Sequence, residues 1–143
     1  MANFIYEKAL TKIALGDIHF DTDDIRVLLV GTITTADTET EVEFISGFTT
    51  LDEFTDASYA RKTLTTKAVN EDLANNRAEF DADNVTWTAL TGDTAQAAIV
   101  YKFVTNDADS IPIAYIDTGG FPQTPAGADL TINWNAEGII QFS

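Results

Sequence analysis

Near the N-terminus, apolar side chains recur with the spacing of a helix. Four of them fall on one helical face, at positions i, i+4, i+7 and i+8: Tyr6, Leu10, Ile13 and Ala14. Gly16 follows this stripe, and glycine commonly ends a helix because it adopts left-handed backbone angles without strain. The pattern predicts one helix over residues 3–15.

Beyond Gly16 the pattern is that of short strands. Thr, Val and Ile become frequent, and Gly, Asn, Asp or Pro interrupts the chain about every ten residues, as in all-β proteins. The predicted strands are 24–31, 41–48, 57–69, 77–82, 85–90, 97–104, 111–117, 128–134 and 139–142. We therefore expect a mainly β protein, an antiparallel sandwich or barrel of about eight strands with one N-terminal α-helix. The sequence shows no internal repeat or long linker, so residues 1–143 are predicted to form a single domain.

Two of the predicted strands differ in how they should be buried. Residues 25–30 are almost entirely apolar, which predicts a central strand covered on both faces, with the helix over one of them. In residues 130–134 apolar and polar positions alternate, so that strand is expected to keep one face in water. Between strands, residues 50–54 fit a short helical turn, with Thr50 as N-cap and Glu53 at the capping-box position.

The composition is that of a globular protein, with 45% hydrophobic and 10% aromatic residues. No apolar run approaches the roughly 18 residues that cross a bilayer. The first residues lack the basic-then-apolar order of a signal peptide, so we expect the chain to stay in the compartment where it is made. It has no cysteine and one histidine, His19, which excludes disulfides, thiol catalysis and a multi-histidine zinc site within one chain.

The charge is strongly acidic and disfavours two classes of partner. Asp and Glu number 23 against 8 Lys and Arg, which gives a formal net charge of -15. Such a field repels phosphate backbones and anionic lipid headgroups, so we expect neither nucleic acid nor membrane as a partner. The one dense basic group, Arg61, Lys62 and Lys67, is interpreted as part of a strand in an acidic protein.

The sequence carries no motif that identifies a catalytic centre. Ser46 lies in Phe-Ile-Ser-Gly-Phe, which lacks the first glycine of a nucleophile elbow, and His19 is expected to be structural. Gly119 and Gly120 are followed by Phe-Pro, unlike a phosphate-binding loop. Carboxylate pairs suited to glycoside hydrolysis arise by chance among so many acidic residues. We expect no enzyme activity and no cofactor.

Closely spaced carboxylates at 21–24, 81–84 and 107–110 offer the oxygen ligands that calcium prefers. None of the three segments continues into a calcium loop with a distal Glu, and Asp and Asn are also ordinary turn residues. We therefore predict turns at these places and no metal site.

Three pairs of residues are candidates for contact with a partner. The first is Phe121 and Pro122, in a loop (119–127) whose prolines constrain the backbone, although a loop aromatic also commonly packs on its own core. The others follow in chain order: Phe4 and Ile5 at the start of the predicted helix, and Arg61 and Lys62 in a predicted strand.

Several blocks of the sequence resemble a family of small structural proteins from the virions of tailed bacteriophages. They are Leu15-Gly16-Asp17-Ile18, the apolar run 24–30, and the segments 43–46, 81–87, 98–102, 113–117 and 122–134. The blocks cover most of the chain, and each is a strand with its turn rather than a catalytic motif. The connection 70–77 departs from the family because it is longer than expected.

The resemblance implies a non-enzymatic part of the particle. The role it favours is a capsid decoration, or cement, protein that binds the outer surface of the major capsid protein lattice and stabilises it. Such a protein is made in the bacterial host cytoplasm and ends on the capsid exterior of the virion. An attachment or head-fibre module and a tail or connector component remain as alternatives, and self-association into a homo-oligomer stays open.

Overall fold

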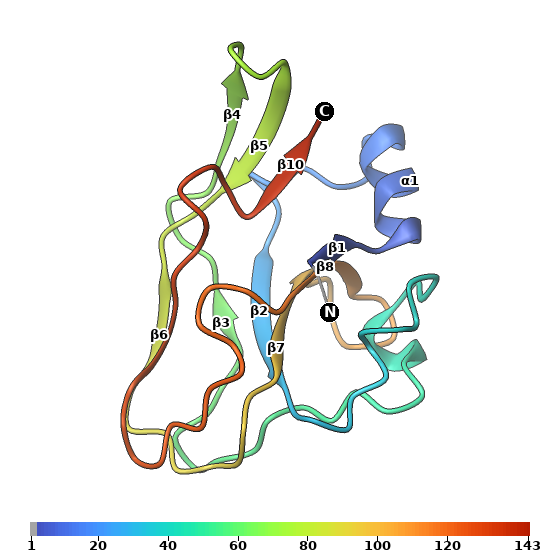
Figure 1. Cartoon of the computed structure of the whole chain (residues 1–143). Helices are drawn as coiled ribbons and strands as arrows, with labels where there is room; N and C mark the ends of the chain where they lie inside the picture. The colour runs from blue at the N-terminus through green and yellow to red at the C-terminus, as the bar shows by residue number, and fades with distance from the viewer. Residues whose placement is uncertain (1–2) are drawn as a thin grey trace.

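The computed structural model describes residues 3–143, which form ten strands, one α-helix and one 3₁₀ turn (Figure 1). In chain order they are β1 (Phe4–Ile5), α1 (Glu7–Leu15), β2 (Ile25–Val30), η1 (Ile45–Gly47), β3 (Lys62–Thr63), β4 (Ala68–Asp72), β5 (Arg77–Asp81), β6 (Val85–Trp87), β7 (Ala97–Lys102), β8 (Ile111–Ile116), β9 (Leu130–Ile132) and β10 (Ile140–Phe142). All strand pairs are antiparallel, which confirms the predicted fold class. Within the described residues the sheets do not close into a barrel.

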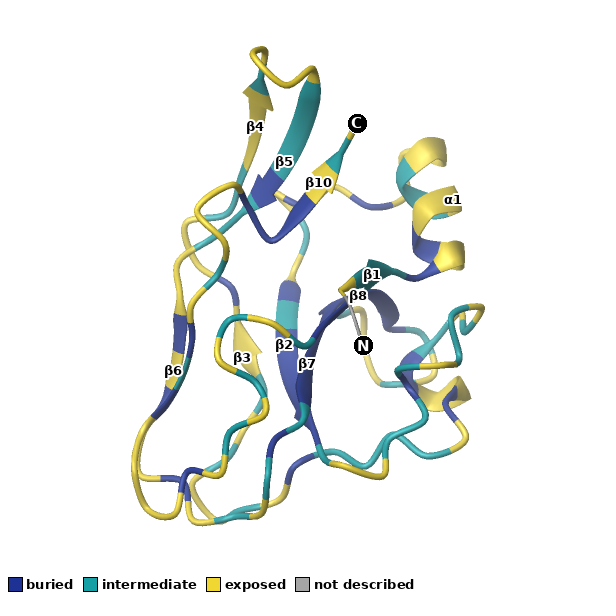
Figure 2. Cartoon of the chain, in the orientation of Figure 1, coloured by how far each residue is buried: buried dark blue, intermediate teal, exposed yellow. Residues whose placement is uncertain are grey.

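The main layer is a five-stranded sheet in the order β1-β8-β7-β2-β3. Its three inner strands are buried along almost their whole length and contain the longest apolar runs of the sequence (Figure 2). Leu28 of β2 lies opposite Ile99 of β7, which in turn lies opposite Tyr115 of β8. The prediction of a central, doubly covered strand at 25–30 is therefore confirmed.

Two smaller sheets complete the fold. One has the order β10-β5-β4, and its strands β4 and β5 form a hairpin that projects from the body (Figure 1). The other pairs β6 with β9. The unexpectedly long connection 70–77 is the end of this hairpin, where Arg77 pairs with Asp72 and Glu79. Leu73, at the hairpin tip, is 84% exposed.

The N-terminal helix is shorter than predicted. It begins at Glu7 because residues 4 and 5 are extended and pair with β8. Its end is as predicted, since Gly16 is left-handed (φ 80°) and donates its N–H to the Ile13 carbonyl. The buried side chains also differ from the predicted stripe: Ala9 is fully buried, whereas Leu10 is 43% exposed. The helix contacts β8 rather than forming a cover centred on β2.

Of the elements predicted after β2, two are wrong and a third is only partly right. Residues 41–48 form no strand, because Ile45–Gly47 form a 3₁₀ turn and the N–H groups of Ile45 and Ser46 bond to the β7–β8 connection. Residues 50–54 are not a helical turn, because this segment runs beside the end of β2: Phe54 donates to the Leu29 carbonyl at 2.9 Å. Of 57–69, only Lys62–Thr63 and the first residues of β4 are strands.

Candidate partner-binding site

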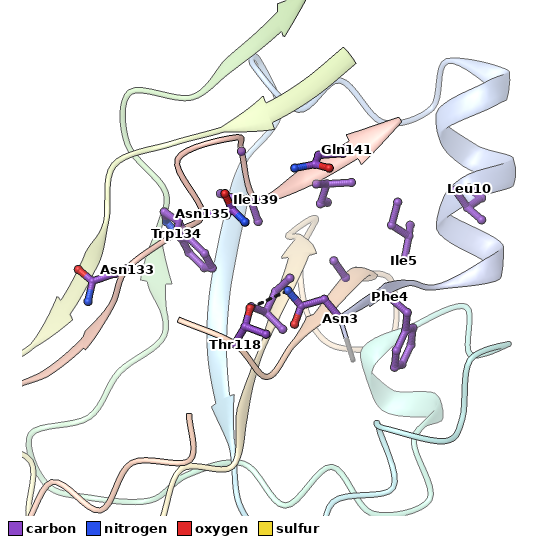
Figure 3. A pocket seen from close by; sticks show the side chains of 14 residues that line it. Asn3, Phe4, Ile5, Leu10, Thr118, Asn133, Trp134, Asn135, Ile139 and Gln141 are labelled. Atoms are coloured by element: carbon purple, nitrogen blue, oxygen red, sulfur yellow. Dashed lines mark hydrogen bonds between the residues drawn. The ribbon is translucent and has the colours of Figure 1, made fainter. Parts of the chain in front are cut away.

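Two strands at the edges of different sheets face one pocket. β1 is an edge strand of the five-stranded sheet, and β10 is an edge strand of the three-stranded sheet. A pocket of about 510 Å³ lies between them, and α1 contributes Leu10 to its wall (Figure 3). Its volume is in the usual range for a binding site in a protein.

One wall of the pocket is the apolar face of the large sheet. Ile5 lies opposite Ala114, and Ala114 and Ile116 are two positions apart on β8, so the three side chains share a face. Ile139 and Ile140 line the pocket from the C-terminal segment. The large sheet therefore supplies an apolar wall, and the C-terminal segment adds two further apolar side chains.

The pocket lies at the edges of the two sheets, so residues from both faces of each edge strand line it. Phe4 and Ile5 are neighbours on β1 and point to opposite faces of the sheet, yet both line the pocket. The same holds for Ile140 and Gln141 on β10. Figure 3 shows Gln141 above the space, Ile5 and Leu10 on its helix side, and Asn3 and Thr118 below it.

Trp134 forms another wall of the pocket, and two hydrogen bonds to the segment between β5 and β6 hold it in place. Its indole Nε1–H donates to the Asp83 carbonyl at 2.9 Å, and its backbone N–H donates to Asn84 Oδ1 at 2.9 Å. Both of these donors are used within the chain. The indole therefore presents ring carbon to the pocket.

The polar side chains around the pocket also bond to their own chain. Asn3 accepts from the Asp117 N–H at 2.9 Å and donates to Thr118 at 2.8 Å, which ties the N-terminal segment to the end of β8. Gln141 donates to the Glu137 carbonyl and accepts from Arg77. Among the described residues that line the pocket, none carries a formal charge.

The predicted contact residues lie in three separate places. Phe4 and Ile5 line the pocket, and Phe4 also stacks on Tyr115 with ring centroids 5.4 Å apart. Phe121 is half-buried and packs against the core, while Pro122 is exposed. A role for Phe121 and Pro122 in binding stays a prediction.

Arg61 holds two loops together, and Lys62 beside it is exposed on β3. The Arg61 guanidinium donates to Glu53 Oε1 and Oε2, both at 2.7 Å, and to Asp107 Oδ1 at 2.6 Å. The Glu53 carboxylate raises the pKa of Arg61 above its ordinary value, against the effect of burial, and Asp107 adds to the shift. Lys62 is therefore the freer member of the pair, and its contact with a partner stays a prediction.

The predicted Asp turns are held by bonds within the chain. The Asp23 carboxylate accepts from the His19 N–H at 2.7 Å and pairs with Lys102 at 3.0 Å. Burial acts to raise the pKa of Asp23, but these two contacts outweigh it and leave the pKa lowered. Asp109 accepts from the Thr105 N–H at 2.9 Å. Within residues 3–143, no cluster of three or more Asp, Glu, His or Cys side chains is placed to hold a metal ion.

Sequence reasoning missed much of the pocket. Leu10 appeared to belong to the core stripe of the helix, and Trp134 to the buried face of a strand. Ile139 and Gln141 gave no local signal, because their place beside β1 depends on the order of strands in two sheets. A usable signal was the apolar pair Phe4 and Ile5 ahead of the helix.

Nothing in the described helices is long and apolar enough to cross a membrane. Comparisons with family models, with curated proteins and with solved structures find no match for this chain.

Proposed function

We propose that the chain is a bacteriophage capsid decoration protein that binds the outer surface of the major capsid lattice through the pocket between β1 and β10. The observation that carries this proposal is the position of Phe4 and Ile5. Both were candidates for partner contact on sequence grounds, and both lie on an open sheet edge that lines the pocket.

The chemistry of the lining supports docking in preference to catalysis. Acid–base catalysis requires a titratable group within hydrogen-bond reach of the reacting atoms. The pocket presents Leu10, Ile139 and the Trp134 ring instead, and tryptophan is among the residues that are enriched where most of the binding energy of protein interfaces is concentrated.

The rest of the molecule suits a protein present in many copies on a particle. Its core is continuous from the helix residue Ala9 to the C-terminal strand residue Ile140, which favours a rigid body. The formal charge of -15 favours a water-facing exterior that does not aggregate. The resemblance to small virion proteins is the reason for proposing the major capsid protein lattice as the partner.

An attachment or head-fibre module is the second candidate, and the β4–β5 hairpin is what favours it. Leu73 at its tip is 84% exposed, and Val69 on β4 is 47% exposed. The hairpin projects from the body (Figure 1) and would present these side chains to a second surface. An attachment module binds cells in the absence of shells, whereas a decoration protein requires the lattice.

Co-sedimentation with shells of the phage assembled without this protein tests the proposal. We expect saturable binding, with a fixed number of copies for each major capsid protein, and a higher melting temperature of the decorated shell. Host cells without shells are the matched control. Binding to cells with no binding to shells would contradict the proposal and favour the attachment module.

A further inference from the structure

We propose that the capsid partner contributes an extended segment that inserts between β1 and β10 as an added β-strand. The inference rests on the proposed function and specifies how the pocket recognises its partner. Addition of a strand to an open sheet edge uses main-chain hydrogen bonds for affinity and side-chain pockets for specificity. The geometry here supplies two edges and one uncharged pocket with both apolar and polar side chains in its lining.

The backbone of β1 is oriented for such pairing. The Tyr6 N–H donates to the Ile113 carbonyl of β8 at 2.9 Å, and Phe4 lies opposite Tyr115 in the same ladder. In an antiparallel ladder, alternate residues direct both backbone groups to the partner strand. Tyr6 and Phe4 therefore bond toward β8, and the N–H and C=O of Ile5 point outward at the sheet edge.

β10 supplies the second edge on the far side of the pocket. It pairs with β5 on one side only, so its other side is an open edge. Its residue Gln141 lines the pocket. β10 has three residues and β1 has two, so an inserted segment of about three to five residues matches their length. Such a segment would join the two sheets, and Leu10 and Trp134 would receive its side chains.

The pocket specifies the chemistry of the segment. Its lining is uncharged, and Asn3 and Gln141 already bond to their own chain, so the inserted residues are expected to be uncharged and apolar at alternate positions. Asp117 is next to Ile116 and Thr118 in the lining, and the chain as a whole carries a formal charge of -15. An acidic segment is therefore disfavoured.

A second copy of this chain is a poorer occupant. Each copy carries a formal charge of -15, and long-range repulsion opposes the approach of two such molecules. The capsid partner is thus the occupant to which the proposal commits. Dimers of the free protein that protect the same edges from exchange would overturn it.

Amide hydrogen exchange on decorated shells tests strand addition directly. In the shell-bound protein, exchange of the segments 3–6 and 139–142 should slow by about tenfold or more relative to the free protein. The hairpin residues 69–76 provide an internal control, because they lie outside the pocket lining. Shell binding without protection of either edge would overturn strand addition while the proposed function stands. Failure of the wild-type protein to bind shells would instead contradict both.

A pair of substitutions separates backbone pairing from side-chain contact. Ile5→Ala and Ile5→Pro both remove the isoleucine side chain, but only proline removes the outward N–H. We expect Ile5→Pro to bind shells about tenfold more weakly than Ile5→Ala, the effect of one hydrogen bond at the upper end of the usual range. Equal binding by the two variants would overturn the proposal. If Ile5→Pro lowers the melting temperature substantially, strand addition is judged by the exchange measurement on the wild-type protein alone.

Discussion

Arg61 and Asp107 lie far apart in the sequence and are joined by a hydrogen bond of 2.6 Å between Nη1 and Oδ1. The same guanidinium bonds to Glu53, so it holds the segment after β2 to the β7–β8 connection. Phe54, next to Glu53, packs in the core. The contact therefore stabilises loops that cover the central strand.

Arg61→Ala should lower the free energy of unfolding by about 2 kcal/mol, because it removes charged hydrogen bonds and leaves two carboxylates close together. Urea denaturation measures this directly. Lys62→Ala is the matched control, since the neighbouring Lys62 is exposed, and it should change the stability by less than about 0.5 kcal/mol. Equal stability of the two variants would show that the Arg61 contacts do not stabilise the fold.

Acid should destabilise the loop between β2 and η1 through Glu39. Its carboxylate accepts from the Thr35 hydroxyl at 2.6 Å and from the Thr49 hydroxyl and N–H, and these bonds lower the pKa of Glu39. A carboxyl with a lower pKa in the folded state stabilises the protein fully above its unfolded pKa of about 4.3. That contribution is lost as the pH falls through the folded pKa.

Glu39→Gln should therefore be less stable than the wild-type protein at pH 7, and the difference should shrink toward pH 3. Denaturation curves at pH 7, 5 and 3 measure it. Glu41→Gln, an exposed neighbour in the same loop, is the control and should follow the wild-type curve. A constant difference between Glu39→Gln and wild type across this range would contradict the assignment.

Gly138 permits the approach of the C-terminal segment to β5. Its φ is 97°, and a Cβ atom there would lie 2.9 Å from the Phe80 carbonyl oxygen. Gly138→Ala should cost about 2 kcal/mol of stability, from backbone strain and from this contact. Gly127→Ala is the control, because Gly127 has φ 90° with nothing within 4 Å, and it should cost about 1 kcal/mol. Equal losses measured by urea denaturation would show that the close approach is not required.

The predictable part of the fold consists of elements with strong local signals. Residues 25–30 and 111–116 are apolar runs too short for helices, and both are central strands. Gly16 marked the helix end correctly because its left-handed conformation is a local property. The alternation of Val42 and Phe44 with acidic residues imitated a strand, but the bonds of Glu39 and Ile45 hold that segment in turns.

The pocket could not be predicted from the sequence, because it is formed by residues that only the long-range pairing of strands brings together. Pairing of Phe4 with Tyr115 joins the N-terminal segment to the distant strand β8, and because residues 4 and 5 are extended the helix begins only at Glu7. In the folded chain Ala9 is fully buried, whereas Leu10 is partly exposed and lines the pocket. Apolar character at Phe4 and Ile5 was visible in the sequence, whereas its place on an open edge follows only from the sheet order.

Salt provides a test of what drives binding to the shell. Copies with a formal charge of -15 repel one another on a lattice, and salt weakens this repulsion because the Debye length is about 8 Å at physiological ionic strength. Binding through the uncharged pocket should therefore hold or strengthen between about 0.05 and 0.5 M salt. Co-sedimentation across this range measures it, and a steady weakening would indicate a contact dominated by charge.

The most direct test of docking through the pocket compares two lysine substitutions on the same helix. Leu10 lines the pocket and is 43% exposed, whereas Leu15 is 72% exposed and lies outside the lining. Both changes add the same charge, and neither disturbs a fully buried side chain, so melting temperatures should stay close to wild type. We predict that Leu10→Lys weakens binding to decoration-free shells by about thirtyfold, the loss of an interface anchor worth about 2 kcal/mol. Leu15→Lys should bind as the wild-type protein does. Equal binding of the two variants would contradict docking through the pocket between β1 and β10.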